Sequence, residues 1–83
     1  MIVKVKLFAT LRSRLPPESN GEEVDLDLAD GATAQDVIDR LAIPPPLAHL
    51  VMVDGYHVLP QERRERPLRP GEVLSIFPPI AGG

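Results

Sequence analysis

The ten prolines of this 83-residue chain constrain its fold more than any other feature of the sequence. Proline fixes its own φ and has no backbone N–H, so it is excluded from helix interiors and from central strands. All of them lie in a few places, at residues 16–17, 44–46, 60, 67 with 70, and 78–79. We therefore expect the regular elements to lie between these places.

The first two segments alternate as strands with one buried face do. In residues 2–8, Val3, Val5 and Leu7 fall on one side and two lysines on the other. In residues 23–28 every second residue is apolar, and acidic residues occupy the positions between them. A period of two residues is typical of a half-buried strand. The loop between them has room for one helical turn at residues 9–15, and we predict an antiparallel pair.

The period then changes to that of a helix. Thr33 is a good N-cap, and Asp36 three residues later resembles the second member of a capping box. Val37, Ile38 and Leu41 follow the spacing of one helical face. The prolines at 44–46 end the segment, so we predict one helix of about ten residues.

The rest of the chain is typical of strands separated by turns. Residues 50–53 form an apolar run, residues 54–55 are a hairpin signal, and residues 56–59 return as a short strand. We interpret residues 60–67 as a solvated loop and 72–77 as the last strand. This order favours an α+β, β-grasp (ubiquitin-like) fold, with a mixed sheet of about five strands and one main helix on one face. The domain then spans residues 1–77, and residues 78–83 form a flexible C-terminal Gly-Gly tail.

Composition excludes several classes of function. The chain has no cysteine, which rules out disulfides, thiolate catalysis, zinc ribbons and iron–sulfur clusters. A net charge of −3 argues against binding nucleic acid through phosphate contacts. No apolar run approaches the roughly 20 residues that span a bilayer. The first residues also lack a signal-peptide pattern, so we expect no membrane contact and a cytoplasmic location.

Candidates for catalysis inside the domain are weak. His49 and His57 are isolated, no serine has a histidine at a recognisable spacing, and we expect no metal. Charge is unevenly distributed, because eight of the twelve acids lie between Glu18 and Asp39, where no lysine or arginine occurs. Two interpretations stay open. The charges form either solvated faces or a docking surface that orients a partner.

The C-terminal tail is the most informative segment. Pro78 and Pro79 favour an extended exit from the last strand and prevent further strand pairing. Gly82 and Gly83 have no side chains, so the terminal carboxylate can pass through a narrow channel into another protein's active site. There ATP would convert this poor electrophile into an acyl-adenylate that sulfur or nitrogen can attack. A Gly-Gly end by itself is also typical of a frayed terminus.

Three segments carry a resemblance that extends over essentially the whole chain. They are Val5–Arg12 (Val-Lys-Leu-Phe-Ala-Thr-Leu-Arg), the turn Pro70–Val73, and Phe77–Gly83 (Phe-Pro-Pro-Ile-Ala-Gly-Gly). Together they resemble the MoaD/ThiS family of sulfur carriers, and within it most of all the small subunit of molybdopterin synthase. The prolines at 44–46 and the charged loop 60–67 are less typical of that family.

The resemblance implies a non-catalytic carrier that works inside an enzyme complex. An E1-like adenylyltransferase of the MoeB type would use ATP to adenylate Gly83, and a sulfur donor would convert it to a thiocarboxylate (1-thioglycine). The tail would then deliver sulfur to cyclic pyranopterin monophosphate in the large subunit of molybdopterin synthase, within a heterotetramer. No cofactor would be bound permanently.

The resemblance also assigns roles to positions. Gly83 carries the active carboxylate, and Gly82 precedes it without a side chain. The residues expected to dock on partners are Phe8, Arg12, Phe77, Pro78, Pro79 and Ile80. Core packing is the rival explanation for the two rings, and an ordinary surface position accounts equally well for Arg12.

Other functions share parts of this pattern. A thiamine-pathway or other biosynthetic carrier would pass its sulfur to a different molecule, although the Phe-Pro-Pro approach favours molybdopterin synthase. A ubiquitin-like modifier would end in an isopeptide bond between Gly83 and a lysine of a target protein. A module that binds through its sheet edge would leave the Gly-Gly end without a purpose.

Overall fold

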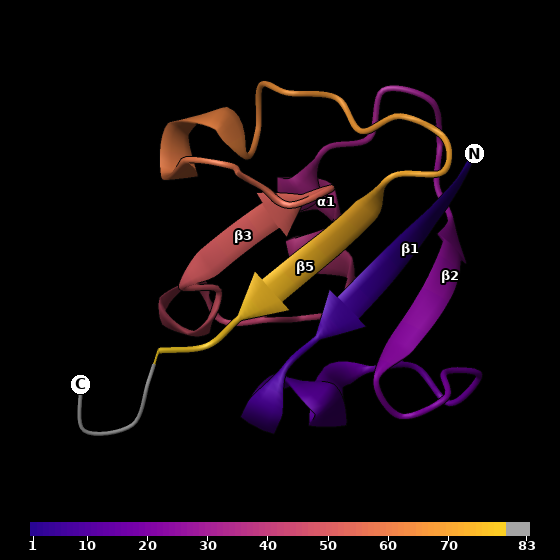
Figure 1. Cartoon of the computed structure of the whole chain (residues 1–83), viewed down its shortest axis with the longest axis vertical. Coiled ribbons are helices and arrows are strands. Elements are labelled where there is room, and N and C mark those ends of the chain that lie inside the picture. The colour runs from indigo at the N-terminus through magenta and orange to yellow at the C-terminus, as the bar shows by residue number, and fades with distance from the viewer. Residues whose placement is uncertain (80–83) are drawn as a thin grey trace.

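The computed structural model describes residues 1–79, so the predictions for Ile80, Gly82 and Gly83 lie outside the described residues. The strands in this part are β1 (Ile2–Leu7), β2 (Glu23–Asp27), β3 (Leu50–Val53), β4 (Tyr56–His57) and β5 (Val73–Phe77). The helix α1 spans Ala34–Arg40, and short 3₁₀ helices are η1 (Ala9–Arg14), η2 (Pro45–Leu47) and η3 (Pro60–Glu62). The predicted order of strands and main helix is confirmed (Figure 1).

The strands of residues 1–79 form one mixed sheet in the order β2-β1-β5-β3-β4. β1 pairs antiparallel with β2, as predicted, and parallel with β5. β3 pairs antiparallel with both β5 and β4. α1 connects β2 to β3 and lies on one face of the sheet, behind the strands in Figure 1. This crossover lets the first and last strands run side by side at the centre, which confirms the predicted β-grasp fold.

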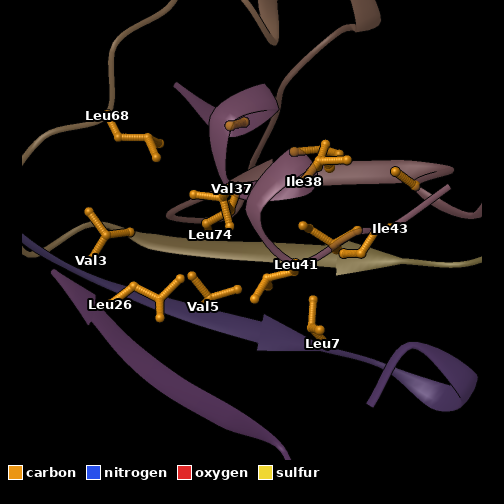
Figure 2. Packing of buried hydrophobic residues seen from close by; sticks show 14 of the residues in the cluster. Val3, Val5, Leu7, Leu26, Val37, Ile38, Leu41, Ile43, Leu68 and Leu74 are labelled. Carbon is orange, nitrogen blue, oxygen red and sulfur yellow. The ribbon is translucent and has the colours of Figure 1, made fainter. Parts of the chain in front are cut away.

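The hydrophobic core lies between α1 and one face of the sheet. Val5 and Leu7 of β1 are buried, and so are Leu74 and Ile76 of β5. The residues of α1 and the segment after it that complete this side of the core are Val37, Ile38, Leu41 and Ile43 (Figure 2). The apolar side chains that the sequence predicts for one face of the strands and one face of the helix therefore pack in one cluster.

Local hydrogen bonds and backbone conformation determine where α1 begins and ends. Thr33 Oγ1 accepts a hydrogen bond from the Asp36 N–H (3.3 Å), and an Asp36 carboxylate oxygen accepts one from the Thr33 N–H (2.9 Å). The predicted capping box is therefore present. The helix ends at Arg40, earlier than predicted, because Ala42 adopts a left-handed φ of 55°. The Ile43 N–H then donates to the Ile38 carbonyl (3.0 Å), which closes the helix as a Schellman motif.

The prediction of a solvated loop at residues 60–67 is wrong in part. Residues 60–62 form η3, and Arg63 is buried, with only 9% of its surface exposed. A guanidinium carries several donors on a long side chain, so it can be buried where backbone carbonyls accept from it. The strand before the loop is also shorter than predicted, since β4 ends at His57.

The two ends of the outer edge of β2 form hydrogen bonds within the protein. The Asn20 N–H donates to the Glu23 carbonyl (3.2 Å), and Asn20 Oδ1 accepts from the Glu23 N–H (2.8 Å). At the other end of the strand, Arg40 Nη1 donates to the Asp27 carbonyl (3.1 Å). Free backbone groups at an edge are what recruit a further strand. The contacts at Glu23 and Asp27 therefore restrict the sheet-edge binding considered above to the middle of β2.

We expect Ala42→Gly to stabilise the fold. A non-glycine residue in the left-handed region costs about 1 kcal/mol, and glycine removes the clash of its Cβ. The free energy of unfolding, measured by urea denaturation, should therefore rise by about 1 kcal/mol. Ala34→Gly within α1 is the matched control and should lower it. Equal destabilisation by both substitutions would contradict the assignment of strain to residue 42.

Candidate functional site

The candidate site surrounds the point at which the chain leaves the sheet. β5 ends at Phe77, Pro78 is half-buried and Pro79 is exposed. Gly83 and the other predicted tail residues follow beyond the described part of the chain. The predicted division between a domain of residues 1–77 and a tail of residues 78–83 coincides with the end of β5, and it stays a prediction.

Two aromatic rings stack at this point. The ring centroids of Phe8 and Phe77 are 4.1 Å apart, and their planes differ by 11°. The parallel pairing of β1 with β5 causes this contact, since it places Leu7 opposite Ile76 and brings the next residue of each strand together. The Phe8 N–H also donates to the Ile76 carbonyl (3.3 Å).

The stacked rings lie outside the hydrophobic core. Phe8 and Phe77 are only half-buried, whereas their neighbours Leu7 and Ile76 are buried in the core cluster. Because side chains alternate across a strand, both rings lie on the face of the sheet opposite α1. Core packing therefore does not account for them.

Ala9 has an unusual backbone conformation beside the rings. Its φ is 52°, in the left-handed region that non-glycine residues rarely enter. This residue begins η1 directly after Phe8, and the buried Leu11 of η1 donates its N–H to the Phe8 carbonyl (3.1 Å). Strain of about 1 kcal/mol is therefore retained where Phe8 is held. An alanine gives no sign of such a conformation in the sequence.

The rings form part of an open groove with a volume of about 1070 Å³, which we call the tail groove. Four of the residues predicted to dock on partners line it together, namely Phe8, Phe77, Pro78 and Pro79. The remaining lining residues come from η1, β3, β4 and η3 or their immediate neighbours, and they are Ala9, Thr10, His49, Leu50, His57 and Pro60. Sequence reasoning did not assign these residues to the site, because they are brought together from distant segments.

Arg12, the other docking prediction within the described residues, lies outside the tail groove. Its exposed side chain donates from Nε to the Leu7 carbonyl (3.4 Å), and Nη2 lies 3.9 Å from Glu22 Oε1. Together with Lys6 and Phe8 it lines a smaller hollow of about 130 Å³. This placement is compatible with both interpretations of Arg12.

Lysines of β1 pair with acids of β2 on the same sheet face. Lys4 Nζ lies 3.3 Å from Asp25 Oδ1 and 3.6 Å from Glu23 Oε1. Lys6 Nζ lies 3.8 Å from Glu23 Oε2. The hydrogen bond from Lys4 to Asp25, together with the charges of both acids, raises the pKa of Lys4. The acid-rich segment is thus partly balanced by its neighbouring strand, and exposed pairs of this kind add little stability.

The tail groove offers few groups for chemistry of its own. His49 and His57 line it as exposed side chains. Within residues 1–79, no three His, Asp or Glu side chains are grouped so as to hold a metal ion. In the same part of the chain, no helix combines the length and the apolar character that crossing a bilayer requires.

The sequence model of the ThiS family matches residues 5–83. The chain belongs to the ThiS family. It is a sulfur carrier protein of the ThiS/MoaD type, and the matched region runs from β1 through the tail groove to Gly83. A search of curated proteins finds no significant match.

Three of the similar solved structures carry the names of two biosynthetic pathways, and another, SAMP1 from Haloferax volcanii, carries neither name (23% identical over 100% of both chains, TM-score 0.70). A putative molybdopterin converting factor, subunit 1, from Pyrococcus furiosus is 25% identical, with 95% of this chain and 98% of that chain covered and a TM-score of 0.68. A chain in the complex of subunits 1 and 2 of molybdopterin-converting factor from Helicobacter pylori 26695 is 18% identical over 100% of both chains (TM-score 0.60). The thiamine biosynthesis protein (ThiS) from Geobacter metallireducens is 14% identical over 100% of both chains (TM-score 0.64). The last two likenesses establish the fold alone.

We expect Phe8→Leu and Phe77→Leu to be energetically coupled. Stacked rings contribute about 1 kcal/mol beyond the area they bury, and either single substitution already removes this contribution. The free energy of unfolding lost by the double variant should therefore be smaller, by about that amount, than the sum of the two single losses. Urea denaturation of the wild type, both single variants and the double variant measures this coupling energy. Phe8→Leu combined with Ile2→Val, at the far end of β1, should be additive. A coupling energy near zero for the two rings would contradict the contact.

Proposed function

We propose that the chain is the small subunit of molybdopterin synthase, a carrier that brings sulfur on Gly83 to the conversion of cyclic pyranopterin monophosphate to molybdopterin. The observation that carries this proposal is the tail groove, a largely apolar surface with stacked rings at the root of a chain end that closes with Gly-Gly. A partner that takes up the tail would cover this surface. Such coverage supplies binding energy while leaving the terminal carboxylate free to react.

The chemistry follows from the terminal carboxylate. One of its oxygens attacks the α-phosphorus of ATP, pyrophosphate leaves, and an acyl-adenylate forms at Gly83. Sulfur from the donor then attacks the carbonyl carbon, AMP leaves, and a thiocarboxylate remains. In the synthase, the thiocarboxylate sulfur would bond to a carbon of the pterin precursor and displace an oxygen substituent from it. Water would then hydrolyse the resulting thioester, which leaves the sulfur on the pterin and returns the carrier as its carboxylate. Partners supply the acids, bases and nucleotide site, and this chain supplies the carboxylate and its position.

The length of the tail suits delivery into a partner. Residues 80–83 come after Pro79 in the sequence, and a chain of that length extends at most about 14 Å. Gly82 and Gly83 carry no side chains, so they fit a channel scarcely wider than the backbone. The tail groove would contact the partner's surface while the carboxylate reaches a site beneath it.

Two partners would use this face in turn. An E1-like adenylyltransferase of the MoeB type would activate Gly83 for a separate sulfur donor, and the large synthase subunit would accept the sulfur within a heterotetramer. The two-subunit complex of molybdopterin-converting factor supports the second of these partners. The cytoplasmic location expected from the sequence stays a prediction.

A thiamine-pathway acceptor is the second candidate, because the family model that matches the chain is that of ThiS. A carrier of that kind would share the loading chemistry and would differ in the partner that removes the sulfur. Two features favour molybdopterin synthase in our proposal, namely the Phe-Pro-Pro exit and the 25% identity to a molybdopterin converting factor subunit over nearly the whole chain.

We expect ATP, a MoeB-type adenylyltransferase and a sulfur donor to increase the intact mass of the chain by the difference between sulfur and oxygen. Deletion of Gly83, or Gly83→Ala, should abolish this gain, because the reacting carboxylate is displaced or obstructed. Intact mass spectrometry measures the gain. The midpoint of thermal unfolding should stay unchanged in both variants, since the change lies beyond β5. A clear loss of stability would show that the tail is part of the core and would contradict the proposal.

The loaded chain then identifies its acceptor. With the large synthase subunit and cyclic pyranopterin monophosphate, molybdopterin should form as the thiocarboxylate returns to carboxylate. Consumption of the thiocarboxylate by a thiamine-pathway acceptor instead, with no molybdopterin formed, would reassign the chain to that pathway. Protein conjugates through Gly83 in the absence of sulfur loading would assign it as a modifier.

A further inference from the structure

Arg63 is a buried cation within a loop that is otherwise mostly exposed. Its Nη1 donates to the Ala48 carbonyl (2.8 Å), and its Nη2 donates to the His49 carbonyl (3.2 Å). Both carbonyls belong to the segment that leads into β3. Arg63 therefore connects the loop after β4 to the start of the strand that pairs with β5.

The hydrogen bonds continue from this connection to the root of the tail. The His49 N–H donates to the Phe77 carbonyl (3.0 Å), and Leu50 pairs with Phe77 in the β3–β5 register. Phe77 in turn stacks on Phe8. A continuous path of contacts thus runs from the Arg63 guanidinium through His49 to the last residue of β5.

The loop that carries Arg63 is itself anchored. The Gln35 N–H, in the first turn of α1, donates to the Arg63 carbonyl (3.0 Å), and the Leu68 N–H donates to the Ala32 carbonyl (2.7 Å). At the start of the loop, the Leu59 N–H donates to Glu62 Oε1 (2.9 Å), which holds η3 and so Pro60, a residue of the tail groove. The rigid part of the fold therefore holds one wall of the groove through this loop.

A buried arginine is an expensive way to stabilise a small core. Its side chain bonds to neutral carbonyls rather than to a carboxylate, its Nε is buried without a hydrogen-bond partner, and desolvation lowers its pKa. An apolar side chain of similar length would avoid these costs. What such a side chain would lack is the pair of donors that holds two successive carbonyls in one orientation.

We propose that Arg63 is a positioning residue for the root of the tail. Through His49 it holds Phe77 in register, so that partners meet the tail groove and the exit of the chain at Phe77 and Pro78 in one arrangement. The effect on partner binding rests on the proposed function, whereas the hydrogen bonds of Arg63 do not depend on it. Among the described residues, the side-chain hydrogen bonds of Arg63 go to the backbone just before β3, so Arg63 acts through that backbone.

The geometric part is tested by amide hydrogen exchange on the intact chain. Arg63→Met removes both donors and keeps the length of the side chain, so exchange at the His49 N–H should become at least about tenfold faster. The Ile76 and Val5 amides at the centre of the sheet should keep their rates. Arg63→Lys, which keeps a charge and a donor, should restore part of the protection. Arg64→Met, the same change at the exposed neighbouring position, should have no effect.

The functional part is tested by ATP–pyrophosphate exchange with a MoeB-type adenylyltransferase. Arg63→Met should raise the KM for the carrier about tenfold with little change in kcat, since the tail is chemically unaltered but presented in more than one arrangement. Leu26→Ala, a core substitution on β2 at the opposite side of the sheet, provides a destabilised control. It should leave KM unchanged at a temperature at which both variants are folded.

The outcomes separate this inference from the proposed function. Unchanged exchange at His49 in Arg63→Met would overturn the inference, and so would equal KM values for Arg63→Met and Leu26→Ala. If the wild-type chain supports no ATP–pyrophosphate exchange, the proposed function fails. The amide exchange of His49 then decides the role of Arg63 by itself.

Discussion

The parallel pairing of β1 with β5 is the constraint on which the rest of this structure depends. It brings the first strand of the chain against the last, and it can form only because α1 carries the chain across the sheet between β2 and β3. One face of the paired strands supplies the centre of the core. At their carboxyl ends the same pairing places Phe8 against Phe77, so the core and the point at which the chain leaves the sheet have one origin.

The proposed function divides the molecule into a folded base and a terminal group that reacts. The base is a small sheet whose buried face packs on α1, and its other face carries paired charges on β1 and β2 and the tail groove beside β3. A carrier needs little more than this. In the proposed function, partners hold the catalytic groups, and the carrier contributes an apolar docking surface and one terminal carboxylate.

Several features were predicted correctly because they depend on local physics. Alternation in β1 and β2, the Thr33–Asp36 capping box and the hairpin at residues 54–55 each follow from residues close together in sequence. The errors have different causes. Left-handed Ala42 shortens α1, and Arg63 is buried within a loop of charged residues. For Arg63, tertiary hydrogen bonds outweigh the average preference of the residue type, whereas Ala42 closes a local Schellman motif in a conformation that alanine rarely adopts.

The sequence by itself determined the fold class, the prolines that separate its elements, the Gly-Gly end and the aromatic residues beside it, because period, proline and glycine act through the local backbone. Only the tertiary structure decided that Phe8 and Phe77 stack outside the core, that His49, Leu50 and Pro60 join them in one groove, and that Arg63 holds the start of β3. These residues lie far apart along the chain. Their proximity depends on strand register and on the crossover through α1, which no local pattern encodes.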